Sequence, residues 1–189
     1  MRMEYSNKFL AMLNLNKKYN IIYADPPWYF KSYSKLGEGR NATRHYPCMS
    51  LTDICNLNIN SIADIHCVLF MWVTDPFLKK SLEVIKAWGF EYKTVAFTWV
   101  KQNKKADTYF KGLGYWTRAN PEMCLLATKG NPKRIGKSVD QLIVSRIERH
   151  SKKPDEIRNR IVELCGDLPR IELFARQKTK GWDAYGNEI

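Results

Sequence analysis

The sequence predicts an α/β protein in which helices cover both faces of a mostly parallel, doubly wound sheet. Short apolar runs of strand length alternate along the chain with amphipathic segments of helical period, and glycine or proline marks many of the changes from one to the next. The 189 residues are enough to bury the core of one such layered unit. We therefore expect a single domain over residues 1–189.

Two strands and a helix are predicted in the first half of the chain. Residues 21–24 form a β-favouring apolar run that stops at an Asp-Pro-Pro sequence, and residues 67–73 are apolar throughout, as in a central strand. Thr74 then provides an N-cap shortly before a proline, so that a helix should run to about Trp88 and end at Gly89.

The second half of the chain predicts three further strands and a helix. The strands are expected at residues 92–100, 123–128 and 170–176. The helix should open at residues 153–156, where proline and two acidic residues occupy the first turn, and end at Gly166. Residues 141–149 are ambiguous between strand and helix. In a doubly wound sheet, ligands bind beyond the carboxyl ends of the strands.

The chain is strongly basic, with 31 lysines and arginines against 19 aspartates and glutamates and a formal net charge of +12. Such a surface attracts polyanions, so nucleic acid is the first expected partner, although the charge could serve solubility alone. Residues 29–49 form a long polar loop in which basic and aromatic residues interleave, which suits contact with phosphates and bases. Residues 101–114 form a second basic loop, which could be the other wall of a groove.

Metal, disulfide and membrane chemistry are not indicated. The five cysteines are odd in number and far apart, without a C-x-x-C pair, and only three histidines could join them as ligands. Residues 1–20 lack the apolar run of a signal peptide, and no segment approaches the length needed to span a bilayer. We therefore expect a cytoplasmic protein with no metal ion and no membrane attachment.

The strongest functional signal is the tetrapeptide Asp25-Pro26-Pro27-Trp28, directly after the first predicted strand. The 6-amino group of adenine is a poor nucleophile because its lone pair is delocalised into the ring. The Asp25 carboxylate and the Pro26 carbonyl could accept its two hydrogens and turn the lone pair toward a methyl donor. Asp25 would also stabilise the positive charge that develops on the nitrogen. The tetrapeptide thus suits methyl transfer to adenine.

The remaining residues of this loop support the same chemistry. The two prolines keep the loop rigid and leave carbonyls without competing N–H donors. Trp28, together with Tyr29, offers a flat face for an extruded base. The alternative interpretation is a simple turn after a strand, since aspartate and proline favour turns and tryptophan favours burial.

Residues 22–28 (IYADPPW) resemble the DPPW family of adenine-N6 methyltransferases. That family includes bacterial and phage DNA enzymes and the catalytic subunit of the eukaryotic messenger-RNA adenine methyltransferase. Further segments recur in the same order as in the family, and the resemblance extends from about Tyr19 to Asn187. These segments are His45-Tyr46-Pro47 with Met49, and residues 69–73, 88–90, 99–101, 114–122 and 153–156.

The resemblance implies the Rossmann-like fold of S-adenosylmethionine-dependent methyltransferases, in a permuted order that puts the catalytic motif before the cofactor strand at residues 172–176. S-adenosylmethionine would be the methyl donor. Lys153 would meet its methionine carboxylate and Asn187 would lie near its ribose, while Glu188 stands where relatives can carry glutamine. The full set of implied cofactor-binding residues is Asp25, Lys153, Glu172, Phe174, Arg176, Asn187 and Glu188.

The same resemblance implies a nucleic-acid substrate. The candidate substrate-binding residues are Tyr29, His45, Tyr46, Trp116, Arg118, Asn120 and Glu122. His45 and Tyr46 could equally serve only to anchor their loop to the domain. We expect an adenine-N6 methyltransferase, and the compact single-domain chain favours DNA over RNA. The alternatives are methylation of RNA and a non-catalytic nucleic-acid-binding subunit of the same fold. A methyltransferase of protein glutamine, which would carry an Asn-Pro-Pro-Tyr pattern, fits less well. A homodimer or a partner subunit stays open.

Overall fold

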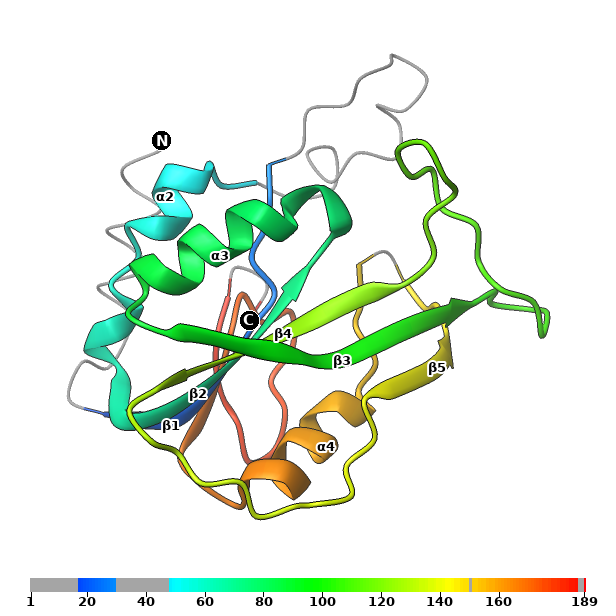
Figure 1. Ribbon diagram of the computed structural model, residues 1–189. Helices are drawn as coiled ribbons and strands as arrows, with labels where there is room; N and C mark the ends of the chain where they lie inside the picture. Colours follow the sequence, from blue (N-terminus) through cyan, green and yellow to red (C-terminus); the bar gives the residue numbers. More distant parts are fainter. Residues whose placement is uncertain (1–16, 30–47, 150, 187–188) are drawn as a thin grey trace.

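Seven strands form one mixed sheet in the part of the chain that the structure describes. The computed structural model describes residues 17–29, 48–149, 151–186 and 189. The strands are β1 (Tyr19–Ala24), β2 (Ala63–Val73), β3 (Glu91–Gln102), β4 (Glu122–Lys129), β5 (Leu142–Arg146), β6 (Arg170–Leu173) and β7 (Asp183–Tyr185). They lie in the order β5-β3-β4-β2-β1-β6-β7 (Figure 1).

Most neighbouring strands are parallel. β1 lies between β2 and β6 and is parallel to both, and the pairs β6–β7 and β3–β5 are also parallel. β4 runs antiparallel to both of its neighbours, β2 and β3. Antiparallel neighbours need no crossover helix, and β4 follows β3 directly through residues 103–121. The predicted α/β class and the largely parallel sheet are confirmed, with β4 reversed.

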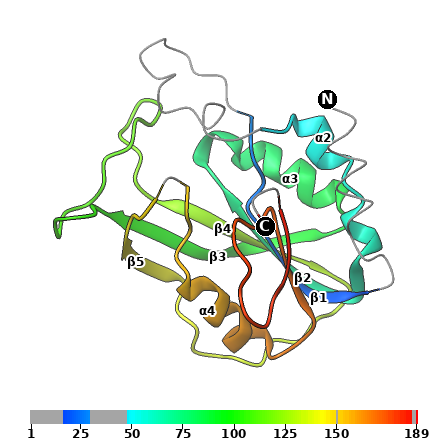
Figure 2. The same ribbon diagram turned by 180° about the vertical axis from the view of Figure 1, so that it is seen from behind.

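Helices cover both faces of the sheet (Figures 1 and 2). They are α2 (Leu51–Cys55), α3 (Leu78–Ala87), α4 (Glu156–Cys165) and the 3-10 helices η3 (Ile59–Ser61) and η4 (Asp75–Phe77). α2 and α3 pack on the face that carries Ile22 and Leu69, whereas α4 packs on the face that carries Ile21 and Phe70. Successive strand residues point to opposite faces, so β1 and β2 contribute to both cores. None of the described helices is long and apolar enough to cross a membrane.

Helix α3 begins later than predicted and ends where predicted. Thr74 makes no side-chain capping hydrogen bond, and the proline that follows it lies in η4, so that the α-helix proper starts at Leu78. At the other end, Gly89 adopts a left-handed φ of 83°. A Cβ at this position would lie 3.0 Å from Oδ1 of Asn60 and would also strain the backbone, which explains why glycine ends the helix.

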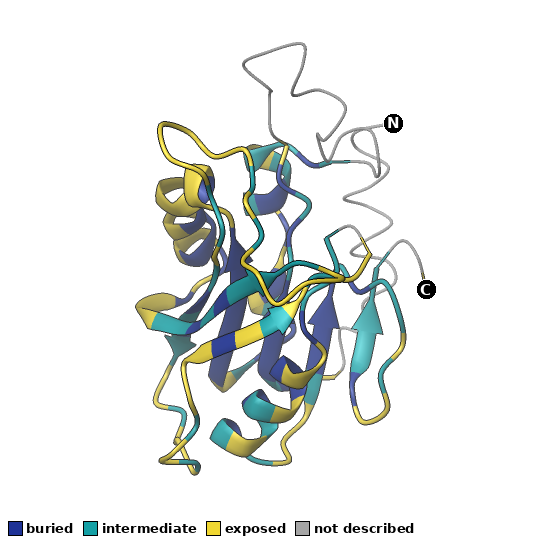
Figure 3. Cartoon of the chain, turned by 90° about the vertical axis from the view of Figure 1, so that its right-hand side faces the viewer, coloured by how far each residue is buried: buried dark blue, intermediate teal, exposed yellow. Residues whose placement is uncertain are grey.

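Three stretches of strand differ from the prediction. The strand expected at residues 170–176 ends at Leu173, because Phe174 adopts a φ of 61° and leaves the extended region. The short strand β7, which pairs with β6, was not predicted. The ambiguous segment contains β5, in which Ile143 is buried between exposed neighbours. Figure 3 shows that the central strands are largely buried, whereas the edge strand β5, the helices and the loops carry many exposed residues.

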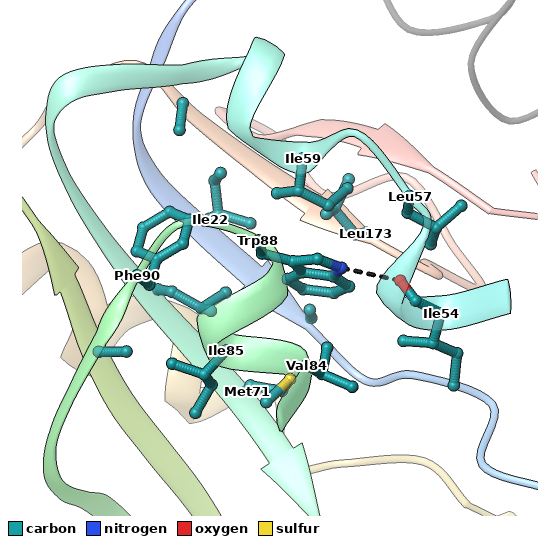
Figure 4. Packing of buried hydrophobic residues seen from close by; sticks show 14 of the residues in the cluster. Ile22, Ile54, Leu57, Ile59, Met71, Val84, Ile85, Trp88, Phe90 and Leu173 are labelled. Atoms are coloured by element: carbon teal, nitrogen blue, oxygen red, sulfur yellow. Dashed lines mark hydrogen bonds between the residues drawn. The ribbon is translucent and has the colours of Figure 1, made fainter. Parts of the chain in front are cut away.

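Trp88 is the largest fully buried side chain in the core beneath α2 and α3 (Figure 4). It is fully buried at the C-terminal end of α3, and its indole Nε1 donates a hydrogen bond to the Ile54 carbonyl at 2.8 Å. The ring therefore joins α3 to α2 while it covers sheet residues such as Ile22. This packing holds α2 and α3 on the face of the sheet opposite to the one that α4 covers.

Replacement of Trp88 by alanine should lower the free energy of unfolding by about 3–5 kcal/mol, because it leaves a large cavity that the surrounding core fills only partly. The measurement is urea denaturation followed by circular dichroism. The exposed Leu82 on the same helix provides the control, since Leu82→Ala should change the free energy of unfolding by less than about 0.5 kcal/mol. Equal losses for the two variants would contradict the assigned core.

Candidate active site

Several predicted site residues meet at one edge of the sheet. Asp25 follows the end of β1, and Phe174 and Arg176 follow the end of the parallel strand β6. Because β4 is antiparallel to β2, its first residue, Glu122, lies at the same edge as the end of β2. Lys153 lies just before α4 and contacts Asp25 from the segment that leads into that helix. Residues from four separate parts of the chain thus converge here.

The Asp25-Pro26-Pro27-Trp28 loop is held by hydrogen bonds of its own backbone. The Pro26 carbonyl accepts one from the Trp28 N–H at 2.8 Å, and the Pro27 carbonyl accepts one from the Met49 N–H at 2.9 Å. The expectation that these carbonyls lack N–H donors is therefore wrong, because the donors come from residues just after the prolines and from the segment before α2. A carbonyl oxygen has two lone pairs, so each can still accept a second hydrogen.

Trp28 lies in the core instead of offering an open ring. Only 8% of the residue is exposed, its ring stacks on Phe77 at 5.4 Å, and its Nε1 donates to the Trp72 carbonyl at 3.3 Å. Tyr29, in contrast, is 55% exposed. The predicted flat face for a base therefore fits Tyr29 better than Trp28, whose contacts anchor the loop to β2 and η4.

Lys153 lies between two carboxylates. Its Nζ is 2.7 Å from Oδ2 of Asp25 and 3.4 Å from Oε2 of Glu122. The other oxygen of Glu122, Oε1, is 2.5 Å from Nζ of Lys101. The Lys153 ammonium also lies 5.6 Å from the centre of the Trp72 ring, a cation–π distance. Lys153 thus has two carboxylates and an aromatic ring among its attractive partners, in a largely buried place.

The two carboxylates have pKa values that shift in opposite directions. Burial raises the pKa of the Asp25 carboxyl, and the charge and hydrogen bond of Lys153 oppose that shift only in part. Burial alone would also raise the pKa of Glu122, but Lys153 and Lys101 together outweigh it and lower that pKa. Asp25 is therefore the carboxylate whose affinity for a proton is increased.

A hollow beside Asp25 contains most of the predicted cofactor residues. It is lined by Tyr23, Asp25, Arg149, Ser151, Lys152, Lys153, Arg158, Glu172, Phe174, Arg176 and Gln177. The predicted residues at its wall are Asp25, Lys153, Glu172, Phe174 and Arg176, which the structure therefore brings together. Asn187 and Glu188 lie outside the described residues. The wall carries charges of both signs within one small space.

Arg158 is a residue of this hollow that the sequence analysis missed. Its Nε and one terminal nitrogen donate to the two carboxylate oxygens of Glu172 at 2.7 and 2.8 Å, and both residues are buried. Burial still raises the pKa of Glu172 despite this contact. The available signal was the position of Arg158 in the apolar stripe of α4, next to Ile157 and one turn before Ile161. A charged residue in such a stripe indicates a buried partner.

Three of the predicted substrate residues, Trp116, Arg118 and Asn120, belong to the loop between β3 and β4, residues 103–121, which we call the arm. Trp116 is 95% exposed with a left-handed φ of 69°, and its ring lies edge-on to Tyr115. Arg118 is also exposed. Asn120 has a different place, because its amide bonds the backbone N–H and carbonyl of Lys101 and the carbonyl of Phe110. Asn120 therefore closes the root of the arm.

Two predicted substrate residues, His45 and Tyr46, lie outside the described residues, as does most of the first basic loop. Among the residues that the structure does describe, no group of three or more histidine, cysteine, aspartate or glutamate side chains could hold a metal ion. The charged groups at this edge are instead partnered with one another.

The fold and this edge define a class of protein. An α/β sheet carries an Asp-Pro-Pro-Trp loop at the end of a central strand, next to a hollow with acidic and basic walls, as expected of an adenine-directed methyltransferase. The model of the MT-A70 family matches residues 19–188. The chain therefore belongs to the MT-A70 family, and the resemblance to adenine-N6 methyltransferases is confirmed.

Individual relatives agree with this assignment. The Type II methyltransferase M.MunI of a Mycoplasma species is 37% identical over 92% of this chain and 78% of its own length. The human N(6)-adenosine-methyltransferase catalytic subunit METTL3 is 32% identical over 91% of this chain, and an N(6)-adenosine-methyltransferase MT-A70-like protein of Drosophila melanogaster is 31% identical over 96%. The chain spans only 28% of the length of each of these two eukaryotic relatives.

Replacement of Arg158 by methionine should lower the free energy of unfolding by about 3–5 kcal/mol at neutral pH, because it leaves Glu172 buried without its cation. The variant should also raise the pKa of Glu172 further. Since a raised folded-state pKa penalises only the ionised carboxylate, the loss should be larger at pH 8 than at pH 4. Urea denaturation at both pH values measures it. The double variant Arg158→Met, Glu172→Gln should recover stability, and no recovery would contradict the pairing.

Proposed function

We propose that this chain transfers a methyl group from S-adenosylmethionine to the 6-amino nitrogen of adenine in DNA. The observation that carries the proposal is the Asp25 carboxylate, which directly follows the strand β1, is paired with Lys153 and borders a charged hollow. Membership of the MT-A70 family supports this reaction. The permuted order of the fold, with the catalytic motif before the cofactor strand, belongs to the same proposal.

The hollow fits S-adenosylmethionine by the chemistry of its wall. The cofactor has a carboxylate, an amine, ribose hydroxyls and an aromatic base. Arg149 and Arg176 could neutralise the carboxylate, whereas Glu172 could accept hydrogen bonds from the amine or the hydroxyls, and Phe174 could contact the base. Lys153 is already engaged by two carboxylates of this chain, so its role toward the cofactor stays a prediction, as do those of Asn187 and Glu188.

S-adenosylmethionine, when bound, supplies an electrophilic methyl group on a positively charged sulfur. Oδ2 of Asp25 accepts from Lys153, so Oδ1 is the oxygen that we propose accepts one hydrogen of the adenine amino group. The Pro26 carbonyl, which already accepts from Trp28, would accept the other through its second lone pair. These two acceptors fix the direction of the nitrogen lone pair.

Asp25 would also serve the later part of the reaction. As the new C–N bond forms, the C–S bond of the methyl donor would break and its electron pair return to sulfur, so the amino nitrogen becomes positive and must lose a proton. A carboxylate whose pKa is raised by burial is a better proton acceptor than an exposed one, and 30% of the Asp25 side chain is in contact with solvent, which can carry the proton away. The same carboxylate would thus orient the base, stabilise its charge and accept its proton.

DNA is favoured over RNA by the pattern of relatives. The chain is 37% identical to the Type II methyltransferase M.MunI and covers 78% of its length, whereas it is 32% identical to METTL3 and covers 28% of its length, so the similarity to M.MunI is the more extensive of the two. The exposed aromatic and basic residues of the arm, among them Trp116 and Arg118, are suited to contact bases and phosphates of the strand that contains the target.

The experiment that tests the proposal is transfer of labelled methyl from S-adenosylmethionine to DNA and RNA of mixed sequence, followed by nucleoside analysis. Methylated deoxyadenosine is expected. Methylated adenosine would show that the substrate is RNA instead of DNA and would leave the proposed chemistry unchanged. Absence of transfer to both DNA and RNA would contradict the proposed activity.

In the same assay, Asp25→Ala should lower kcat by a factor on the order of 10² to 10³ or more, because it removes the group that orients and stabilises the amino nitrogen. Affinity for S-adenosylmethionine, measured by calorimetry, should fall only modestly. The exposed Glu83 on α3 offers a control, and Glu83→Ala should leave both quantities unchanged. Retention of activity in Asp25→Ala would contradict the proposed mechanism.

Removal of the Trp116 ring should weaken DNA binding without affecting the cofactor. A base stacked on an aromatic side chain contributes about 1–3 kcal/mol, so Trp116→Ala should raise the Kd for an oligonucleotide by about tenfold. Fluorescence anisotropy measures this value. Tyr92→Ala removes another exposed ring at the opposite end of β3 and should leave the Kd unchanged. Equal effects of the two variants would remove the arm from the proposed interface.

A further inference from the structure

Lys101 and Glu122 extend the ion pair of Asp25 and Lys153 into a chain of four alternating charges. From Lys101 Nζ the chain runs 2.5 Å to Glu122 Oε1, and from Glu122 Oε2 it runs 3.4 Å to Lys153 Nζ. Lys153 Nζ is then 2.7 Å from Asp25 Oδ2. The four side chains come from the end of β3, the start of β4, the segment before α4 and the end of β1. We call them the charge chain.

Lys101 and Glu122, the two members of the charge chain that lie farthest from Asp25, are buried more than a nucleic-acid contact requires. The side chains of Lys101 and Glu122 are 15% and 18% exposed, and the ammonium of Lys101 lies over the rings of Trp99 and Phe110. Burial of a second ion pair costs desolvation energy, and apolar residues of similar size often replace such a pair without loss of stability. Packing alone therefore gives no reason for charges at these two positions.

The order of the charges suggests what they do. Lys153 is shared between Asp25 and Glu122, so the hydrogen bonding that it gives to Asp25 depends on how strongly Glu122 attracts it. Glu122 is in turn shared between Lys153 and Lys101. We propose that Lys101 and Glu122 are positioning residues that act through Lys153. Their charges set how strongly the Lys153 ammonium interacts with Asp25. The proposal rests on the methyl transfer proposed above. In it, Lys101 and Glu122 do not contact the substrate.

Other charged and titratable groups also face Asp25. Arg176 lies after β6, Glu172 on β6 and Cys124 on β4. Burial is the largest influence on the pKa of Asp25 and raises it, Lys153 and Arg176 lower it, and Glu122 raises it. Arg158 holds Glu172 by a two-point contact, so the substitutions proposed below change the charge chain while that neighbouring pair stays in place.

The test is the acid limb of the pH profile of kcat/KM for methyl transfer, which reports the group that must be ionised in the free enzyme. Glu122→Gln removes an anion that raises the pKa of Asp25 and releases Lys153 to it, so the limb should move to lower pH. In Lys101→Met, Glu122 stays ionised and keeps Lys153 as its cation. It therefore attracts the Lys153 ammonium away from Asp25, so the limb should move to higher pH. Each should change kcat/KM at a fixed acidic pH by about threefold or more.

Three further variants sharpen the result. In the double variant Lys101→Met, Glu122→Gln the effect of Lys101 should disappear, because it acts only through the charge of Glu122. Lys101→Arg keeps the cation and should restore the profile. Lys93→Met removes an exposed lysine from the same strand and should leave the limb in place. Shifts of the two single variants in the same direction, or no shift in either, would overturn the proposal.

Failure of this proposal can be told apart from failure of the proposed function. If the wild-type chain transfers no methyl group, the pKa of Asp25 can still be followed directly by NMR titration of its ¹³C-labelled carboxyl carbon in the same variants, and the opposite shifts are expected there too. If methyl transfer occurs but both variants lower kcat/KM equally at every pH, Lys101 and Glu122 support the fold and the charge-chain proposal is wrong.

Discussion

Lys153 and Asp25 are 128 residues apart in the sequence, yet their side chains meet at 2.7 Å. This contact requires that β1 end beside β6 and that the segment before α4 return to the same edge of the sheet. Because the pair is largely buried, either charge without the other would be costly, so the contact fixes the position of the loop and of the helix start together. Both side chains line the hollow beside the pair.

The reversed strand β4 gives this edge its second carboxylate. In a wholly parallel sheet, the first residue of a strand lies at the edge opposite to the ends of its neighbours. Since β4 runs against β2 and β3, its first residue, Glu122, arrives where those strands finish. Glu122 lies opposite Trp99 in the ladder, and Lys101, two residues further along β3, reaches it diagonally. One antiparallel strand is therefore what allows the charge chain to form.

The sequence was informative where the chemistry is local. The strand before Asp25, the apolar strand β2, the helices α3 and α4 and the family resemblance all follow from patterns within short segments. The burial of Trp28 could not be inferred, because a tryptophan suits a core and a base-stacking platform equally. Asn120 and Arg158 could not be assigned partners, because Phe110 and Glu172 approach them only in the folded chain. β7 is too short to have a period of its own.

The closure of the arm by Asn120 has a consequence for how such proteins can diverge. Its amide joins the backbone of Lys101 and Phe110, and the Gly112 N–H bonds the Ala119 carbonyl just above, so the strands beneath are held independently of the tip. The segment beyond these hydrogen bonds can be lengthened, shortened or exchanged without moving the carboxylates at the strand ends. New preferences for flanking sequence could therefore arise in evolution at the tip, while the chemistry of the strand ends is inherited unchanged.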